Sequence, residues 1–504
     1  MNNNQKKIFN SVTNAIGIKA DTSKINVKQT PSYLKEPISV ADFIAGVVAA
    51  LGAAVDKLGQ VRGLPAQEIG VDRRLATLSL NNAMFDYLNG VAIQGGEITV
   101  PVNSFFQDKK GRWMCTNGAY PHLRNGILKY FNAPHDQAAL IKAVAKHDLD
   151  KIEEDFEKLR LCVAPYMTHE EWLQHPQGKA MAKHSVVMVE KQADGPAGLL
   201  AQAKYRPLEG VKVIDVTHVV AGPWATRVLA DHGADVISVR NGGFPMLYPM
   251  IFEESCGKKQ IILDLNIERE KERFIELVKT ADVLVWGYGP GSLDRLGLTT
   301  EKLMELNPNL VITRETAYGP TGPWKNRKGW EQLCQTHSGM VDLASKGRKQ
   351  KHLVAALPLD YGTGYLAAIG TIGALIQRQE KGGFFEVNAM LGRTAMEILE
   401  LPKEAEDAVP ISVDEMGNYM IDQVTDFRGA IFTRLKSALD LSHTPAFCAT
   451  GPAIIGTDDS WNTTWDTEVK EVKPSHYPTK MLERGLSPGV LTGYGHEDIM
   501  HRPE

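Results

Sequence analysis

The segment VKVIDVTHVVAGPWATRVLADHGADVISVR, residues 211–240, decides the fold. It begins with a β-branched run, Val211–Val216, which is bounded by Gly210 and by the loop THVVAGP. The stretch WATRVLADHG has the character of a helix and ends at Gly233, a residue type that commonly terminates helices. A second apolar run, ADVISVR, comes next. This strand–helix–strand order predicts two parallel strands joined by a crossover helix.

The same alternation continues along the chain. Three further apolar runs, IILDL (261–265), ADVLVWGYGPG (281–291) and LVITRETAYG (310–319), predict strands. The stretches between them are a charged segment that ends near Thr280 and the segment EKLMELNP, and both have helical character. We therefore predict an α/β fold, with an open Rossmann-like parallel sheet, helices on both faces, and a smaller α+β domain.

Composition argues against several classes of protein. The 504 residues include 56 Lys and Arg against 60 Asp and Glu, a formal net charge of −4, so the basic excess of a nucleic-acid binder is missing. No run approaches the ~18 apolar residues of a membrane-spanning helix, and the first residues lack the apolar core of a signal peptide. Five widely spaced cysteines without a CxxC pair indicate reduced thiols. We expect a cytoplasmic protein with no metal, membrane or nucleic-acid partner.

Shifts in composition divide the chain into five segments. Residues 1–35 are polar and predict a poorly ordered arm, and residues 36–190 contain a helix and a small domain. The range 191–207 is rich in Ala, Gly and Gln and is interpreted as a linker. Residues 208–396 hold the α/β block, and residues 397–504 form a C-terminal return segment. Inside the second segment we predict a helix over 40–58, strands near 97–102 and 112–115, a helix over 136–160, and a helix start at the capping box Thr168–Glu171.

An internal repeat links two helical segments that contain many small residues. Asp42, Gly46, Ala49, Ala50 and Gly52 recur as Asp360, Gly364, Ala367, Ala368 and Gly370, each displaced by 318 positions. Shared composition alone is the other explanation for this match. If the repeat is real, both helices must pack closely against another element, and the α/β block between them occurs only once.

Several residues in this frame suit a ligand that carries phosphates. Ligands of open parallel sheets lie beyond the carboxyl ends of the strands. In THVVAGP, Gly222 allows close backbone approach and the next helix start offers free amides. After the fourth strand, Tyr288 could stack on a base and Arg295 could reach a phosphate. The alternatives are an ordinary strand–helix turn and a solvated surface arginine.

Two carboxylates are candidates for chemistry. Asp360 lies between an apolar run and a helix that begins YGTGYLAAIG, whose glycines leave room for a bulky ligand. An oriented carboxylate can act as a nucleophile through a mixed anhydride, although the spacing alone favours a helix N-cap role for Asp360. Glu331, in GWEQLCQTHSG, is the second candidate, and a surface position in the first turn of a helix is its alternative.

The motifs resemble the class III CoA-transferases, the family of formyl-CoA transferase, carnitine CoA-transferase and alpha-methylacyl-CoA racemase. PLEGVKVIDVTHVVAGPWATRVLADHGADVISV resembles the family's opening, and the likeness continues through GKKQIILDL, ADVLVWGYGPGSLDRLGL, AYGPTGPW and PLDYGTGYLAAIG, to about Met396. VPVNSFFQDKKGRWM and YMTHEEWLQHPQ are similar to the small domain and to the segment after it, and LKSALDLSHTPA is similar to the C-terminal return. The small-domain half comes first here and one α/β block is missing, which suggests a truncated or rearranged tandem.

This resemblance implies a function and a site. Asp360 matches the aspartate that attacks an acyl-CoA thioester, forms a mixed anhydride and then an aspartyl-CoA thioester, and passes CoA to an acceptor carboxylic acid. Glu331 matches a glutamate beside the active site of the formyl-CoA transferase branch. The implied ligand is coenzyme A, bound as acyl-CoA, and the family's interlocked subunits imply a homodimer. The residues that fall where the family contacts CoA are Val219, Val220, Tyr288, Arg295 and Lys328.

Departures from the family pattern keep alternatives open. Trp330 stands where the racemase branch has a histidine, Gly287 stands where the family often has Asn, and the usual Glu-Arg pair reads Arg240-Asn241. Asp42 also fits the aspartate motif, and we interpret it as a vestigial copy. The alternatives to a CoA-transferase are a non-catalytic CoA-binding homologue that depends on a partner, and an acyl-CoA isomerase or racemase.

Overall fold

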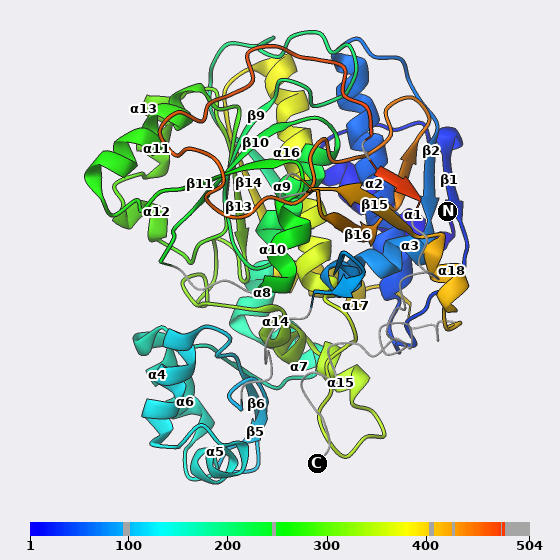
Figure 1. Cartoon of the computed structure of the whole chain (residues 1–504). Coiled ribbons are helices and arrows are strands. Elements are labelled where there is room, and N and C mark those ends of the chain that lie inside the picture. The colour runs from blue at the N-terminus through cyan, green and yellow to red at the C-terminus, as the bar shows by residue number, and fades with distance from the viewer. Residues whose placement is uncertain (94–100, 244–247, 403–407, 426–428, 475, 479–504) are drawn as a thin grey trace.

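A seven-stranded sheet in the order β11-β10-β9-β12-β13-β14-β8 lies at the centre of the protein (Figure 1). The computed structural model describes residues 1–93, 101–243, 248–402, 408–425, 429–474 and 476–478. Counted along the chain from β9, the first six strands are parallel and lie in the order 3-2-1-4-5-6, that of a Rossmann fold. The predicted open parallel sheet is confirmed. The strands are β8 Val187–Ala193, β9 Lys212–Val216, β10 Asp235–Arg240, β11 Lys258–Ile262, β12 Val283–Trp286, β13 Val311–Thr316 and β14 Phe384–Met390.

Helices cover both faces of this sheet because successive side chains of a strand point to opposite sides. Val213 and its neighbours pack with the helices α9 and α16, whereas Ile214 and its neighbours pack with α11 and α13. The helices of this half are α9 Ala221–Asp231, α10 Tyr248–Ser255, α11 Glu268–Thr280, α12 Ser292–Arg295, α13 Thr300–Leu306, α14 Glu331–Ser338, α15 Met340–Ala344, α16 Pro358–Lys381 and α17 Leu391–Leu399.

The N-terminal segment is helical, which corrects the prediction of a poorly ordered arm. Helix α1 (Asn3–Ala15) begins at a capping box formed by Asn2 and Gln5. It buries Ile8, Phe9 and Val12 in the main core, because these residues lie on one side of a helix. The sequence analysis missed this apolar stripe because most residues of the segment are polar.

The repeated segments form two long helices that pack on each other, α2 (Val40–Val61) and α16. Their glycines permit close contact with a further helix on each side. A Cβ atom on Gly364 would lie 2.6 Å from the carbonyl oxygen of Ala221 in α9, and one on Gly46 would lie 2.8 Å from that of Gln5 in α1. Helix α1 therefore contacts α2 much as α9 contacts α16. The predicted close packing of both helices is confirmed.

A smaller α+β unit lies apart from the sheet in Figure 1 and is coloured cyan. Its three strands form an antiparallel sheet in the order β5-β6-β7, and its helices cover a separate apolar core. The predicted helix over 136–160 is two helices, because Asp148 caps a new helix start. The elements are β5 Phe105–Gln107, β6 Trp113–Thr116, β7 Val163–Pro165, α4 Pro121–Phe131, α5 Gln137–Val144 and α6 Leu149–Leu159.

Three other sequence predictions for residues 97–174 have different outcomes. The capping box of Thr168 and Glu171 is present at the start of α7 (His169–Gln174), as predicted, and α8 (Pro176–Met181) comes after it. The strand predicted near 97–102 falls mainly on residues 97–100, which lie outside the described residues, and residues 101–102 form a turn. The strand predicted over 112–115 corresponds to β6.

The C-terminal segment returns to the N-terminal third of the chain. One sheet has the order β18-β15-β16-β3-β4 and another β1-β2-β17, so each combines strands from both ends of the sequence. These elements are β1 Ile25–Lys28, β2 Ile69–Asp72, α3 Arg73–Leu78, β3 Tyr87–Leu88, β4 Val91–Ala92, α18 Val413–Gly417, β15 Met420–Val424, β16 Ile431–Leu435, β17 Leu439–Leu441 and β18 His476–Pro478. In the described part of the chain, no helix is long and apolar enough to cross a membrane.

Candidate functional site

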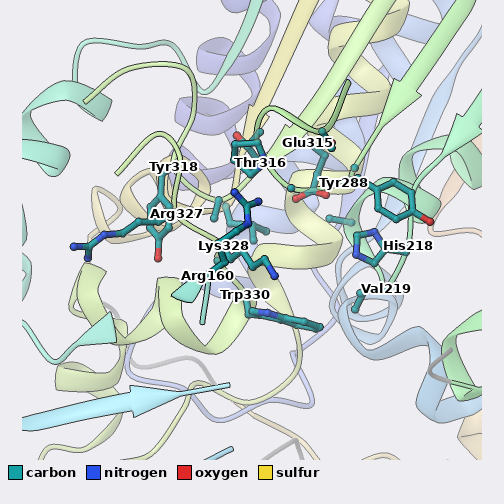
Figure 2. Close-up of a pocket in the computed structure, with 18 of the residues that line it drawn as sticks. Arg160, His218, Val219, Tyr288, Glu315, Thr316, Tyr318, Arg327, Lys328 and Trp330 are labelled. Carbon is teal, nitrogen blue, oxygen red and sulfur yellow. The ribbon is translucent and has the colours of Figure 1, made fainter. Parts of the chain in front are cut away.

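A cavity of about 340 Å³ lies beyond the carboxyl ends of β9, β12 and β13. Strands β9 and β12 are neighbours, and the order of the sheet reverses between them, so the cavity occupies the crevice where open α/β sheets bind ligands. Figure 2 shows its wall. Six residues predicted from the sequence line it, namely Val219, Val220, Tyr288, Arg295, Lys328 and Asp360.

Asp360 is in the first turn of α16, and its carboxylate faces the cavity. No side chain caps this helix start, so Asp360 is not the N-cap that its sequence context allowed. Among the described residues, no hydrogen bond or ion pair holds the carboxylate. Burial raises the pKa of Asp360 to about 7. The Asp360 carboxyl group therefore loses its proton near neutral pH and is open to the cavity.

Glu331, at the first residue of α14, lies behind Asp360 and is only 1% exposed. Its Oε2 accepts a 2.6 Å hydrogen bond from the backbone N–H of Asp360, and its Oε1 accepts one of 2.7 Å from Gln335. Burial, and then the charge of Asp360, raise the pKa of Glu331 well above its ordinary value. Glu331 is thus not a surface residue, and it contacts the turn that carries Asp360.

Three basic side chains form one side of the cavity: Arg160, Arg295 and Lys328. Among the described residues, no carboxylate pairs with any of them. Burial lowers the pKa of Lys328, and the charges of Arg160 and Arg295 contribute to the decrease. Like charges held together without counter-ions suit a ligand with several phosphate oxygens. Arg160 comes from the end of α6 in the small unit, so no local sequence signal places it here.

Aromatic rings form another part of the wall. The rings of His218 and Tyr288 stack with centroids 4.5 Å apart, and Tyr120 of the small unit stacks on His218 at 6.0 Å. Burial lowers the pKa of His218 to about 3, so the imidazole is neutral. Trp330 tilts against Tyr120 at 5.4 Å. Trp330 therefore supplies no titratable base to this part of the wall.

The loop after β9 is held in a strained conformation. Val219 has a φ of 71°, in the left-handed region that β-branched residues avoid. Buried Lys258 supports this loop by donating hydrogen bonds to Asp215, to the carbonyl of Pro223 and to Thr226, at 2.7–2.9 Å. Strain that the surroundings maintain is common where backbone approaches a ligand.

Gly222 has a packing role in the structure, away from the cavity wall. A Cβ atom at this position would lie 2.5 Å from Cβ of Thr217, so only glycine allows helix α9 to lie this close to the end of β9. Contact of Gly222 with a ligand remains a sequence-based prediction. The five cysteines are all buried with free thiols.

Glu315, at the end of β13, is a cavity residue that the sequence analysis missed. Burial raises its pKa to about 8, and the charge of Asp360 contributes to the increase. The sequence could have identified this residue, because Glu315 is a carboxylate near the carboxyl end of a predicted parallel strand. Within the described residues, no group of three or more His, Cys, Asp or Glu is arranged to hold a metal ion.

Asp42, the repeat counterpart of Asp360, differs from it because hydrogen bonds hold its carboxylate. Its Oδ1 accepts hydrogen bonds from Nε of Arg73 at 2.8 Å, from Gln5 at 2.9 Å and from Asn2 at 3.0 Å. Helix α1 and Arg73 therefore occupy the space in front of this carboxylate. The same helix position carries an open carboxylate in α16 and a fully engaged one in α2.

Comparison with known proteins identifies the α/β region. Residues 208–402 match the family described as CoA-transferase family III. The similar proteins include a formyl-CoA:oxalate CoA-transferase from Rhodopseudomonas palustris, 35% identical over 198 residues that cover 37% of this chain and 46% of that protein. They also include a probable fatty acyl-CoA transferase from Mycobacterium tuberculosis, 33% identical over 190 residues that cover 35% of this chain and 48% of that protein. The α/β region, residues 208–402, is thus similar to CoA-transferase family III. The chain spans about half the length of the curated relatives it matches.

Two solved structures are similar over part of the chain. A crystal structure from Mycobacterium tuberculosis has 32% sequence identity and a TM-score of 0.36, covering 38% of this chain and 56% of that one. A CAIB/BAIF family protein from Brucella suis has 27% identity and a TM-score of 0.38, covering 41% of this chain and 62% of that one.

Proposed function

We propose that this protein is a CoA-transferase, which moves CoA from an acyl-CoA thioester to an acceptor carboxylic acid with Asp360 as the nucleophile. The observation that carries the proposal is the open Asp360 carboxylate in a cavity at the switch point of the region that is similar to CoA-transferase family III. The named relatives act on formyl-CoA with oxalate, or are described as fatty acyl-CoA transferases. Formate, oxalate and fatty acids are therefore the classes of acid to test first.

In the first half of the reaction, a carboxylate oxygen of Asp360 attacks the carbonyl carbon of the thioester. The C–S bond breaks, CoA leaves as a thiolate, and the donor acyl group remains on Asp360 as a mixed anhydride. The thiolate then attacks the aspartyl carbonyl carbon and releases the donor acid as its carboxylate. Asp360 now carries CoA as a thioester.

The second half repeats these steps in the opposite direction. The acceptor carboxylate attacks the aspartyl thioester and expels CoA thiolate, which leaves a new mixed anhydride between Asp360 and the acceptor. The thiolate attacks the acceptor carbonyl carbon and restores the Asp360 carboxylate. Each step exchanges one acyl bond for another, so neither a net proton nor water is consumed, and water must be kept from the anhydride.

The basic side of the cavity suits the phosphates of CoA. Arg160, Arg295 and Lys328 supply cations on one side of the cavity, and the aromatic rings supply an apolar wall. Binding energy from these remote contacts can hold the thioester carbonyl against Asp360. In this arrangement both the α/β region and the small unit contribute to the site.

An acyl-CoA isomerase or racemase is the second candidate. Trp330 provides no base, but Glu315 is a second titratable carboxyl on the cavity wall. Two such groups could exchange a proton at the carbon next to the thioester. Mass spectrometry distinguishes the reactions, since only proton exchange introduces solvent deuterium at that carbon and only transfer moves CoA to a second acid.

The direct test is transfer of CoA by the purified full chain. Formyl-, acetyl- and octanoyl-CoA are incubated with oxalate, acetate and octanoate, and new thioesters are identified by mass spectrometry. We expect transfer with at least one pair, and a loss of at least about 10³-fold in Asp360→Asn. Asp42→Asn is the matched control, because it makes the same change at the equivalent helix position outside the cavity.

A covalent intermediate gives a second measurement. Hydroxylamine added during turnover should convert the aspartyl thioester to a hydroxamate on the peptide that contains Asp360, and the mass of that peptide should increase accordingly. Transfer that persists in Asp360→Asn, or a label on another peptide, would exclude Asp360 as the nucleophile. Failure of every donor–acceptor pair to exchange CoA would count against transferase activity itself.

A further inference from the structure

Glu315 and Asp360 both line the cavity. Its side chain leaves the end of β13, and Figure 2 shows it pointing into the cavity on the side of Tyr288. Among the described residues, neither a hydrogen bond nor an ion pair holds the Glu315 carboxyl. A carboxyl group in a largely apolar wall without a protein partner is available for a ligand.

The surroundings make room for this group. A Cβ atom on Gly287, at the end of β12, would lie 3.3 Å from Oε2 of Glu315. A side chain at position 287 would crowd both Thr217 and the Glu315 carboxyl group, which lies directly beside this glycine. Glu315 thus occupies space beside Gly287, next to the loop where Val219 and Val220 form the cavity wall.

The charge environment favours the neutral form of Glu315. Burial raises its pKa to about 8, and the nearby charge of Asp360 acts in the same direction. The cations Arg160, Arg295 and Lys328 are not among the groups that shift this pKa. The pKa of Asp360 is about 7 and that of Glu315 about 8, so the pair releases its first proton mainly from Asp360 and keeps the second mainly on Glu315, whose O–H can donate a hydrogen bond.

We propose that Glu315 is a second catalytic residue, which donates a hydrogen bond from its neutral carboxyl group to the oxygen of the carbonyl that Asp360 attacks. This inference rests on the proposed function, because it assigns Glu315 a role in the same reaction. The Glu315 O–H bond stays intact throughout. As the Asp360 oxygen adds to the carbonyl carbon, the π electron pair moves to the carbonyl oxygen, and the Glu315 hydrogen bond stabilises the negative charge formed there.

The neutral acid suits this position for an electrostatic reason. A second carboxylate beside Asp360 would repel the oxyanion, whereas a carboxylic acid presents a donor in a poorly solvated site. Because Glu315 keeps its proton throughout the reaction, it adds no charge to the site at any step. Glu315→Gln retains a neutral donor of nearly the same shape, and Glu315→Ala removes it.

Infrared difference spectroscopy tests the protonation of Glu315 without any turnover. The full chain should show a protonated carboxyl band that is lost in Glu315→Gln and that disappears with a midpoint near pH 8. In Asp360→Asn this midpoint should fall, because the neighbouring negative charge is removed. A band unaffected by Glu315→Gln, or a midpoint that Asp360→Asn leaves unchanged, would overturn the assignment.

Single-turnover release of the donor acid from formyl-, acetyl- and octanoyl-CoA, measured without an acceptor acid, tests the catalytic role. We expect Glu315→Ala to slow this release by about 10²-fold or more, with little change in the acyl-CoA concentration that gives half of the maximal rate. The rate of Glu315→Gln should stay within about tenfold of the wild-type rate, and it should not decrease above pH 8. A wild-type rate in Glu315→Ala, or equal damage in both variants, would overturn the proposal. Absence of transfer in the wild type would instead reject the proposed function, which the infrared measurement distinguishes from a failure of the Glu315 assignment.

Discussion

The backbone N–H of Asp360 donates a hydrogen bond of 2.6 Å to Oε2 of Glu331, so one buried carboxyl group holds the turn that presents the other. This contact makes Glu331 a positioning residue, since its side chain lies behind Asp360 and outside the cavity wall. Its second oxygen is held by Gln335, which fixes the side chain relative to α14.

We predict different effects for two substitutions of Glu331. Glu331→Gln keeps an oxygen acceptor and should lower kcat modestly, whereas Glu331→Ala leaves the Asp360 N–H without its partner and should lower kcat by about tenfold or more at nearly unchanged KM for acyl-CoA. Steady-state kinetics of both variants give this comparison. An increase in KM at constant kcat would place Glu331 in direct contact with substrate.

The rate of transfer should depend on pH through Asp360. In the proposed reaction Asp360 must be ionised to act as the nucleophile, and its pKa lies at about 7. We therefore expect kcat/KM to rise by about tenfold per pH unit below pH 7 and to level off at higher pH, until Glu315 ionises near pH 8. Asp360 and Glu315 interact electrostatically, so the two midpoints of the pH profile describe the pair and are not the separate pKa values of the two residues. A rate that is already maximal at pH 5 would contradict this assignment.

The raised pKa of Asp360 also affects stability: ionisation of Asp360 increases the rate of transfer but lowers the free energy of unfolding. The folded-state pKa of Asp360 is higher than the ordinary value of 3.8, so the unfolded chain releases this proton first as the pH rises. Ionised Asp360 consequently lowers the free energy of unfolding between about pH 4 and pH 7, and the penalty persists at higher pH. Asp360→Asn should stabilise the protein at pH 8, by at most about 4 kcal/mol, with little effect at pH 4. Urea unfolding at both pH values measures the difference.

Local patterns predicted the elements whose periodicity is strong. The parallel strands and the helix that contains Asp42 were found because apolar runs and small residues recur at regular spacing. The strand ends led to Tyr288 and Arg295, whereas Val219 came from the resemblance to the family. Helix α1 was missed because its apolar stripe lies within a polar segment. Arg160 and Tyr120 reach the cavity through the packing of the small unit against the α/β region, a long-range contact that no local pattern encodes.

Three of the basic residues that line the cavity, Arg160, Arg295 and Lys328, should recognise the phosphates of CoA. We expect Arg160→Ala and Lys328→Ala each to raise KM for acyl-CoA by about tenfold, with kcat little changed and with a weaker dependence of KM on salt. Comparison with the 3′-dephospho form of the same acyl-CoA shows which phosphate each residue contacts. A variant that binds both forms as the wild type does would exclude its residue from phosphate recognition.

Lys325 provides a matched control for these variants. It lies on the same cavity wall, but it is not among the charged groups that shift the pKa of Lys328, whereas Arg160 and Arg295 are. Lys325→Ala should change KM less than Lys328→Ala if the three basic residues form one phosphate site. Equal increases in KM for Arg160→Ala, Lys328→Ala and Lys325→Ala would instead indicate a general attraction of the anionic ligand.

The repeat predicts opposite effects for the two equivalent aspartates. Asp42 is paired with Arg73 at 2.8 Å and is shielded by α1, whereas Asp360 is open. Asp42→Asn should therefore lower the free energy of unfolding by about 1–3 kcal/mol and leave transfer unchanged, while Asp360→Asn should abolish transfer. A double-mutant cycle with Arg73→Met should give a coupling of about 0.5–3 kcal/mol, because the two side chains share one contact. Loss of transfer in a folded Asp42→Asn variant would show that the second aspartate is functional and that the α2 site is more than a structural remnant.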